Sequence, residues 1–150
     1  GTVFCGWLRL GDHPRLQALL YRQSGLLGVS GISADMRRLR ADGSVAAQKA
    51  IALFTHRVVR ESGAMVPCLG GLDVLDFCDG IGEHYAQLRA DVCARLAFLG
   101  VQIDPVRNQA AVGSETLAVH APGSAVEVWV VPTDEGLVAA REALQLLEMA

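Results

Sequence analysis

The sequence predicts an α/β fold. Two apolar segments suited to strands, 72–77 and 127–131, are each followed by a turn and a helical pattern, and this alternation is typical of α/β domains. The composition agrees, because 51% apolar and 19% charged residues suit a globular core. A chain of 150 residues fits one domain, which buries about 70% of the surface exposed by the unfolded chain.

The N-terminal part of the chain predicts short helices separated by turns. Residues 14–22 begin with a proline and carry leucines on one side, which favours a helix. The segment 26–33 is apolar but interrupted by glycines, so we expect a turn-rich connection there. Residues 34–40 are expected to form one or two helical turns, with Ser33 as the N-cap.

The longest helical pattern begins at Ser44, after a break at Asp42-Gly43. Proline at 67 and glycines at 70 and 71 are expected to end it. The positions that recur at helical spacing are Ala47, Ile51, Phe54, Val58, Ser62 and Met65.

The next segments predict a strand and a second long helix. The strand at 72–77 is largely apolar on both faces, which is typical of a central strand covered by helices. A helix is expected from about His84 to Leu99, with Gly100 as its cap. Asp104-Pro105 is expected to form a turn.

The C-terminal part predicts further strands and a last helix. Residues 101–103 suit a short strand and residues 116–120 an edge strand. A turn at 121–123 leads to the strand at 127–131, which is nearly all valine and tryptophan. A helix is expected from the turn at 132–135 to about Leu147.

Charge and hydropathy argue against two classes of partner. The net charge is -3, and the one short basic cluster, 37–40, is flanked by Asp35 and Asp42, so we expect no nucleic-acid surface. No apolar stretch approaches the roughly 20 residues that span a bilayer, and no signal peptide is evident. We therefore expect a cytoplasmic protein without a membrane segment.

The cysteines and histidines show no metal-binding pattern. Cys5, Cys68, Cys78 and Cys93 are widely spaced in apolar surroundings and form no C-x-x-C pair. We expect buried, reduced thiols rather than disulfides or metal ligands. The four histidines have no ligand spacing with one another or with the cysteines.

The segment 77–84, Phe-Cys-Asp-Gly-Ile-Gly-Glu-His, carries the clearest functional signal. It joins an apolar strand to a helical pattern through two glycines. Glycines let main-chain N–H groups approach a phosphate, and a helix N-terminus favours negative charge. The alternative is a turn that only reverses the chain, and the motif alone leaves both open.

Three blocks of the chain are similar to blocks of one enzyme family. Residues 24–37 read SGLLGVSGISADMR, residues 77–84 read FCDGIGEH and residues 131–135 read VPTDE. They resemble the SGLLGLSG-x-S-x-D-x-R block, the FTGGIGEN loop and the IPTNEE turn of the acetate/propionate kinase (acetokinase) family. The resemblance covers most of the chain from residue 24 to residue 147, and residues 1–23 match poorly.

The resemblance implies a fold and a place in a longer enzyme. Acetokinases have the actin-like ATPase (ribonuclease H-like) fold of the sugar kinase, heat-shock protein and actin superfamily. This chain resembles their C-terminal half, so residues 1–150 are expected to form a single C-terminal nucleotide-binding domain. The family's N-terminal half carries the acyl pocket and the His and Arg residues that stabilise the transferring phosphoryl group, so no catalytic residue is assigned here.

The resemblance also implies a nucleotide site built from two segments, with a magnesium ligand beside it. The residues implied to bind nucleotide are Asp35, Met36, Arg37, Gly80, Ile81, Gly82, Glu83 and His84, and the implied ligand of Mg²⁺ is Glu135. A plainer interpretation makes Met36 a core residue and Arg37 a surface charge, and makes residues 133–135 only the start of the last helix.

The segment 77–84 and the residue that follows it depart from the family at four positions. Cys78, Asp79, His84 and Tyr85 stand where Thr, Gly, Asn and a small residue are usual. A carboxylate at position 79 beside a polyphosphate is unfavourable by roughly 1 kcal/mol or more. Gly136 also replaces the second glutamate of the last turn, so a Thr-x-x-Glu capping box is lost.

The implied activity is phosphoryl transfer from ATP to acetate or another short carboxylate, giving ADP and an acyl phosphate. This chain would supply the nucleotide- and Mg²⁺-binding half, and we expect it to be inactive alone. The alternative is a non-catalytic, dimerising remnant domain with a degraded nucleotide loop. The expected partners are the nucleotide, the short-chain carboxylate or acyl phosphate, and a second copy of the chain in a homodimer.

Overall fold

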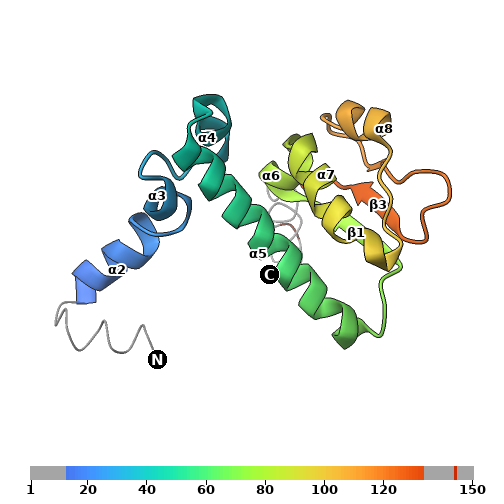
Figure 1. Ribbon diagram of the computed structural model, residues 1–150, viewed down its shortest axis with the longest axis horizontal. Helices are drawn as coiled ribbons and strands as arrows, with labels where there is room; N and C mark the ends of the chain where they lie inside the picture. Colours follow the sequence, from blue (N-terminus) through green and yellow to red (C-terminus); the bar gives the residue numbers. More distant parts are fainter. Residues whose placement is uncertain (1–12, 134–143, 145–150) are drawn as a thin grey trace. The chain divides into compact units, whose positions relative to one another are not determined.

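The computed structural model describes residues 13–133 and residue 144 (Figure 1). The chain separates into two compact units, residues 1–58 (unit 1) and residues 59–150 (unit 2), and their boundary falls inside one long helix. The expectation of a single nucleotide-binding domain stays a prediction.

The described elements confirm an α/β chain. In order they are α2 (His13–Arg22), α3 (Gly25–Ser30), α4 (Met36–Asp42), α5 (Val45–Leu69), β1 (Val74–Phe77), α6 (Asp79–His84), α7 (Ala86–Arg95), the 3-10 helix η1 (Ala97–Leu99), α8 (Pro105–Ala110), β2 (Leu117–Ala118) and β3 (Glu127–Val130). None of these helices is long and apolar enough to cross a membrane.

Unit 1 contains a helix where a turn-rich connection was expected. Helix α3 occupies most of the segment 26–33, so that expectation was wrong. The glycines lie mainly at its ends: Gly25 has φ 62°, and Gly31, at φ 66°, donates its N–H to the Leu27 carbonyl. Glycine at a helix end favours termination rather than absence of a helix, because only the end residue needs the left-handed conformation.

Helix α4 is capped by Asp35, whereas Ser33 was predicted as its N-cap. The Asp35 Oδ1 atom accepts the Arg37 N–H at 2.8 Å. The Ser33 hydroxyl instead accepts the N–H of Asp35 itself, at 3.0 Å. Both side chains satisfy N–H groups at the helix start, and the helix begins two residues later than predicted.

Helix α5 begins as predicted, and the Ser44 hydroxyl accepts the Ala47 N–H at 3.2 Å. Pro67 lies inside the helix instead of ending it. The end is set by the two glycines, because Gly71 donates to the Val66 carbonyl at 3.1 Å and Gly70, at φ 76°, donates to the Pro67 carbonyl. This pair of bonds is a Schellman motif, which confirms the predicted stop.

The core of unit 1 lies between α4 and the first turns of α5. Leu39, Ala47 and Ala50 are buried together, and the partly buried Leu26 and Ile51 pack against them. The predicted apolar stripe is followed only in part, because Met65 is 52% exposed.

Unit 2 is built on a three-stranded sheet with the order β1-β3-β2. Strands β1 and β3 are parallel, with Phe77 opposite Val130, and β2 runs antiparallel to β3. Strand β3 is therefore central among the described strands, with β1 at their edge, so the central position expected for β1 is not confirmed in this part of the chain. The two strands differ in burial: Val128 and Val130 are buried, whereas Asp76 of β1 is exposed.

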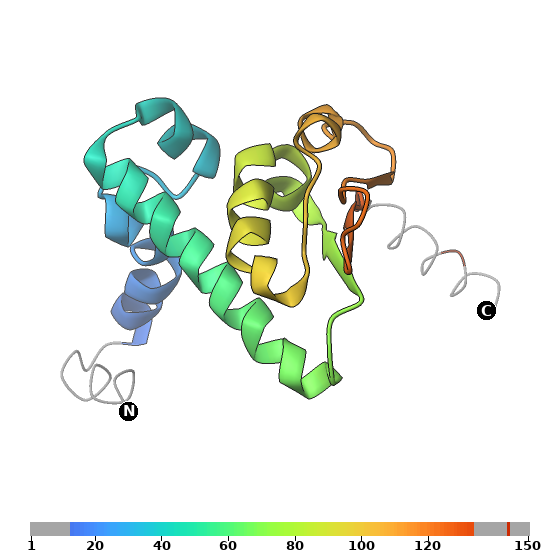
Figure 2. The same cartoon turned by 45° about the vertical axis from the view of Figure 1, so that its right-hand side comes forward.

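Helices α6 and α7 lie beside this sheet (Figure 2). The predicted helix from His84 to Leu99 is divided, since α6 already begins at Asp79 and Tyr85, with φ -119° and ψ 81°, separates it from α7. Gly100 caps the end of η1 at φ 89°, as expected.

Helix α8 replaces the turn predicted at Asp104-Pro105. Asp104 is its N-cap and accepts the N–H groups of Val106 and Arg107 at 2.9 and 3.1 Å. An Asp followed by Pro is a favourable helix start as well as a turn signal, because proline suits the first helical position.

The remaining strand predictions are largely confirmed. Val101 and Ile103 form isolated bridges with Val126 and His120. Strand β2 lies at an edge of the sheet. The turn after it is closed by a bond from the Ser124 N–H to the Ala121 carbonyl. The last predicted helix lies outside the described residues.

The cysteines correct one expectation. Cys93 is buried, and burial raises the pKa of its thiol to about 12. Cys68 and Cys78 are exposed, so the prediction of buried thiols was wrong for these two. All three are free thiols, and Cys5 lies outside the described residues.

Candidate nucleotide-binding site

The glycine segment, residues 80–84, follows a residue whose backbone conformation suits glycine better than aspartate. Strand β1 ends at Phe77, Cys78 is extended, and Asp79 has φ 62°, the one positive φ of a non-glycine residue in the described part of the chain. Aspartate tolerates this left-handed region better than most residues. The Asp79 Oδ1 atom also accepts the Gly80 N–H at 2.6 Å. The carboxylate therefore occupies the first amide of the segment.

The two glycines of the segment differ in what surrounds them. A Cβ atom on Gly82 would lie 3.3 Å from the carbonyl carbon of Phe77, so close packing on the end of β1 explains this glycine. A Cβ atom on Gly80 would meet nothing within 4 Å, and Gly80 does not have a positive φ. The described chain gives no internal reason for glycine at position 80, and its surface is open.

Glu83 links the glycine segment to the end of β3. Its Oε1 atom accepts both the N–H and the hydroxyl of Thr133, at 2.9 and 3.0 Å. The side chain is buried, and the Thr133 N–H is the main cause that lowers the pKa of this carboxyl below its ordinary value. Glu83 was predicted to bind nucleotide, which stays a prediction, and in the described chain its carboxylate accepts hydrogen bonds from a residue 50 positions away.

Arg89 lies beneath the glycine segment and is fully buried. It donates to carbonyl groups at the ends of two helices and to one side-chain amide. The acceptors are the carbonyls of Gly82 and Glu83 from α6, the carbonyl and Oδ1 of Asn108 from α8, and the carbonyl of Ala111. Arginine has five N–H donors, so all of them are used.

Burial lowers the pKa of Arg89 from its ordinary value. Arginine nevertheless stays protonated in proteins, and carbonyls at helix C-terminal ends favour a cation. Arg89 was not among the residues predicted from the sequence. The available signal was an arginine three positions before the buried Val92 and seven before the buried Leu96, on the apolar side of the helix.

The first predicted segment, 35–37, lies at the start of α4 in unit 1. Asp35 pairs with Arg37, through Oδ2 to Nη2 at 2.8 Å and Oδ1 to Nε at 3.2 Å. The Arg37 side chain lowers the pKa of Asp35 to about 2. Met36 is 5% exposed, which favours a packing role for it in the described chain, whereas the Arg37 side chain is 87% exposed.

The second predicted segment, 80–84, forms most of α6 in unit 2. Within it Gly80 and His84 are exposed, and Ile81 and Gly82 are half-buried. The two segments thus belong to different compact units. Their meeting around one adenosine stays a prediction.

Magnesium also stays a prediction. Among the described residues no group of three or more His, Cys, Asp or Glu side chains is placed to hold a metal ion. Mg²⁺ in phosphoryl-transfer sites commonly uses one or two carboxylates together with substrate phosphates. The carboxylate assigned to it, Glu135, lies outside the described residues, two positions after Thr133.

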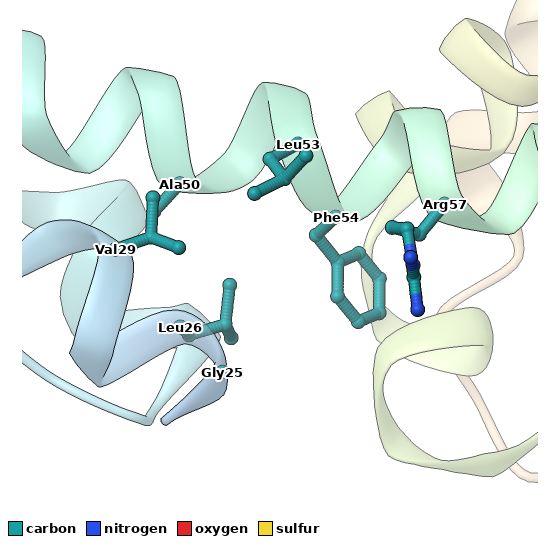
Figure 3. A pocket seen from close by; sticks show the side chains of 7 residues that line it. All are labelled: Gly25, Leu26, Val29, Ala50, Leu53, Phe54 and Arg57. Carbon is teal, nitrogen blue, oxygen red and sulfur yellow. The ribbon is translucent and has the colours of Figure 1, made fainter. Parts of the chain in front are cut away.

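Unit 1 contains an open pocket of about 410 Å³ (Figure 3). In the close view, Phe54 and Arg57 of α5 project beside each other at one end of it. The lining residues are Gly25, Leu26, Val29, Ala50, Leu53, Phe54 and Arg57. None of the predicted nucleotide-binding residues lines this pocket, so it gives no support to the predicted site.

Comparison with known proteins agrees with the three sequence blocks. The chain is 48% identical over 133 residues to acetate kinase of Rhodopseudomonas palustris and 40% identical over 136 residues to that of Dictyoglomus turgidum. In both cases the match covers 89% of this chain and 33% of the relative. The chain therefore spans about a third of the length of these relatives.

Solved structures are similar over nearly the whole chain. Porphyromonas gingivalis acetate kinase matches with a TM-score of 0.85 and 32% identity, covering 98% of this chain and 38% of that one. Francisella tularensis propionate kinase matches with a TM-score of 0.75 and 33% identity, covering 91% and 35%. The acetokinase family model matches residues 12–141. The chain therefore belongs to the acetokinase family.

Proposed function

We propose that this chain provides the nucleotide- and Mg²⁺-binding part of an acetate kinase. The whole reaction transfers the γ-phosphoryl group of ATP to an oxygen of acetate or another short carboxylate, giving ADP and an acyl phosphate. The observation that carries the proposal is Gly80, which the described fold does not require to be glycine and whose surface is open. Membership of the acetokinase family supplies the chemistry.

In this proposal the segment 80–84 contacts the phosphates, and 35–37 lies against the adenosine. Arg37 is suited to base, ribose or phosphate, because its side chain is exposed and its Nη1 atom has no partner in the described part of the chain. Glu135 would hold Mg²⁺, which neutralises charge on the transferring group. The bond from Glu83 to Thr133 supports this arrangement, since it ties the glycine segment to the strand end that leads to Glu135.

The finer fold assignment also belongs to this proposal. We place the chain in the actin-like ATPase superfamily, within the C-terminal half of a cytoplasmic, homodimeric enzyme. Catalysis of phosphoryl transfer is mainly positioning and charge stabilisation. Since the chain spans about a third of its relatives, we expect no turnover by these 150 residues alone.

Calorimetry with MgADP tests the proposal. Binding in the micromolar range supports it, and no heat of binding at millimolar MgADP contradicts it.

Alkylation of cysteines locates the site, because Cys78 precedes the glycine segment and Cys68 lies on α5, and both thiols are exposed. MgADP is expected to slow alkylation of Cys78 and to leave Cys68 unchanged. A hydroxamate assay for acetyl phosphate checks the expected lack of turnover.

The second candidate is a non-catalytic, dimerising domain with a degraded nucleotide loop. Two observations favour it. The Asp79 carboxylate occupies the Gly80 amide, and the described chain exposes several large apolar side chains, among them Tyr21 at 83% and Val45 at 67%. This candidate predicts a dimer in sedimentation experiments together with no MgADP binding. A monomer that binds MgADP contradicts it.

A further inference from the structure

We propose that Arg89 is a positioning residue, which holds the glycine segment 80–84 in place by joining the C-terminal ends of α6 and α8. The inference deepens the proposed function and rests on it, because the ligand that the segment would contact is the nucleotide. Arg89 itself has no N–H group left for a phosphate. It acts only through the backbone that it binds.

The geometry of the guanidinium group suits this task. Its Nη1 atom donates to the carbonyls of Gly82 and Glu83, both at 2.7 Å. Its Nε and Nη2 atoms donate to Asn108 and Ala111, 19 and 22 positions further along the chain, at distances between 2.7 and 3.0 Å. One rigid fork therefore connects the last carbonyls of two helices, each of six residues, that are distant in sequence.

A lysine cannot replace this group. Its single ammonium carries three donors on one atom and cannot reach both helix ends in the planar arrangement of a guanidinium. The Asn108 side chain completes the link, because its amide donates to the Ala86 carbonyl at 2.9 Å while its oxygen accepts from Arg89. All of these bonds lie within unit 2.

The segment is consequently held by other residues at Gly82 and Glu83, whereas the surface of Gly80 is open. The Glu83 carbonyl is held by Arg89 and its carboxylate by Thr133. Gly82 packs on Phe77. A binding segment that is already immobilised loses less conformational entropy when the ligand binds, so the affinity is higher. Loosening the Arg89 bonds should lower nucleotide affinity even when the chain stays folded.

The test compares Arg89→Lys with Val126→Ala in the full chain. Val126 is a buried residue of unit 2 that bridges to Val101, and it precedes the end of β3 opposite to the end that pairs with Phe77. Amide hydrogen exchange is followed by mass spectrometry in peptides covering 77–85 and 117–130, and MgADP affinity is measured by calorimetry. Asn108→Ala, which removes one side-chain anchor, serves as a milder second variant if Arg89→Lys does not fold.

Arg89→Lys is expected to speed exchange in 77–85 by roughly tenfold, with a smaller change in 117–130, and to weaken MgADP binding by about tenfold. Val126→Ala is expected to show the reverse pattern of exchange and an unchanged affinity. Equal acceleration of both peptides by Arg89→Lys would overturn the inference, as would a faster 77–85 segment with unchanged affinity. If the unaltered chain binds no MgADP, the proposed function fails, and exchange alone then decides whether Arg89 holds the segment.

Discussion

Replacing Asp79 separates two effects that this residue exerts on the glycine segment. Its carboxylate places a negative charge where phosphates are proposed to bind, and its Oδ1 atom occupies the Gly80 N–H at 2.6 Å. Asp79→Gly removes both effects. Asp79→Asn removes the charge but keeps an oxygen that accepts the same N–H and a residue that tolerates a positive φ.

The charge contributes about 1 kcal/mol against a phosphate some 7 Å away, at a dielectric between that of water and that of a protein surface. Asp79→Asn is therefore expected to lower the MgADP Kd by about fivefold. Freeing the Gly80 N–H for a phosphate adds about 1 kcal/mol to the free energy of binding, which is the usual net contribution of one hydrogen bond. Asp79→Gly is thus expected to lower the Kd by roughly 20–30-fold.

Stability should change little in Asp79→Gly. Relief of the left-handed conformation at φ 62° contributes about 1 kcal/mol or less, because aspartate tolerates it. The greater freedom of glycine in the unfolded chain offsets this by roughly 0.5–1 kcal/mol. Denaturant unfolding should therefore place the variant within about 1 kcal/mol of the unaltered chain.

Calorimetry at two salt concentrations is the decisive assay. The gain from Asp79→Asn should shrink at 1 M salt, where the Debye length is about 3 Å, and the additional gain from Asp79→Gly should persist. Equal affinities for all three proteins would refute the reasoning. An Asp79→Asn variant that binds as tightly as Asp79→Gly would show that charge, and not the occupied amide, is the relevant term.

Other variants follow from the same segment. Gly80→Ala should leave the free energy of unfolding unchanged or raise it by up to about 1 kcal/mol, because the added Cβ atom meets nothing within 4 Å, but it should weaken MgADP binding. Gly82→Ala should lower the free energy of unfolding, because the added Cβ atom would lie 3.3 Å from the Phe77 backbone. Urea unfolding and calorimetry compare the two variants. Glu83→Gln should lower stability by about 1–2 kcal/mol at pH 7. Because the folded-state pKa of Glu83 is lowered, its contribution to stability is present above the ordinary pKa of 4.5 and is lost as the pH falls through the folded-state pKa. The unfolding curves of the two proteins should therefore converge in acid. A stability difference that stays constant with pH would exclude this carboxylate as the cause. Iodoacetamide should modify Cys78 in the native chain and Cys93 only after unfolding, as peptide mass spectrometry can verify; rapid native labelling of Cys93 would contradict its burial.

Local sequence signals determined the elements whose ends are set by neighbouring residues. Ser44 starts α5 and Gly70-Gly71 ends it, because caps and left-handed glycines act within one helical turn. The strand around Val128 was predictable from its β-branched residues. The blocks at 24–37, 77–84 and 131–135 indicated the family, since spacing along the chain is itself sequence information.

Only the tertiary structure decided how distant residues meet. In the tertiary structure β1 lies at an edge of the described sheet, the Glu83 carboxylate accepts hydrogen bonds from Thr133, and Arg89 is buried between helix ends. The bond of Glu83 joins residues 50 positions apart, the bonds from Arg89 to Asn108 and Ala111 join residues 19 and 22 positions apart, and the pairing of β1 with β3 is also long-range, so no local pattern specifies them. A buried arginine or glutamate looks like a surface charge in the sequence, because its cost of desolvation is offset only by partners that folding brings to it.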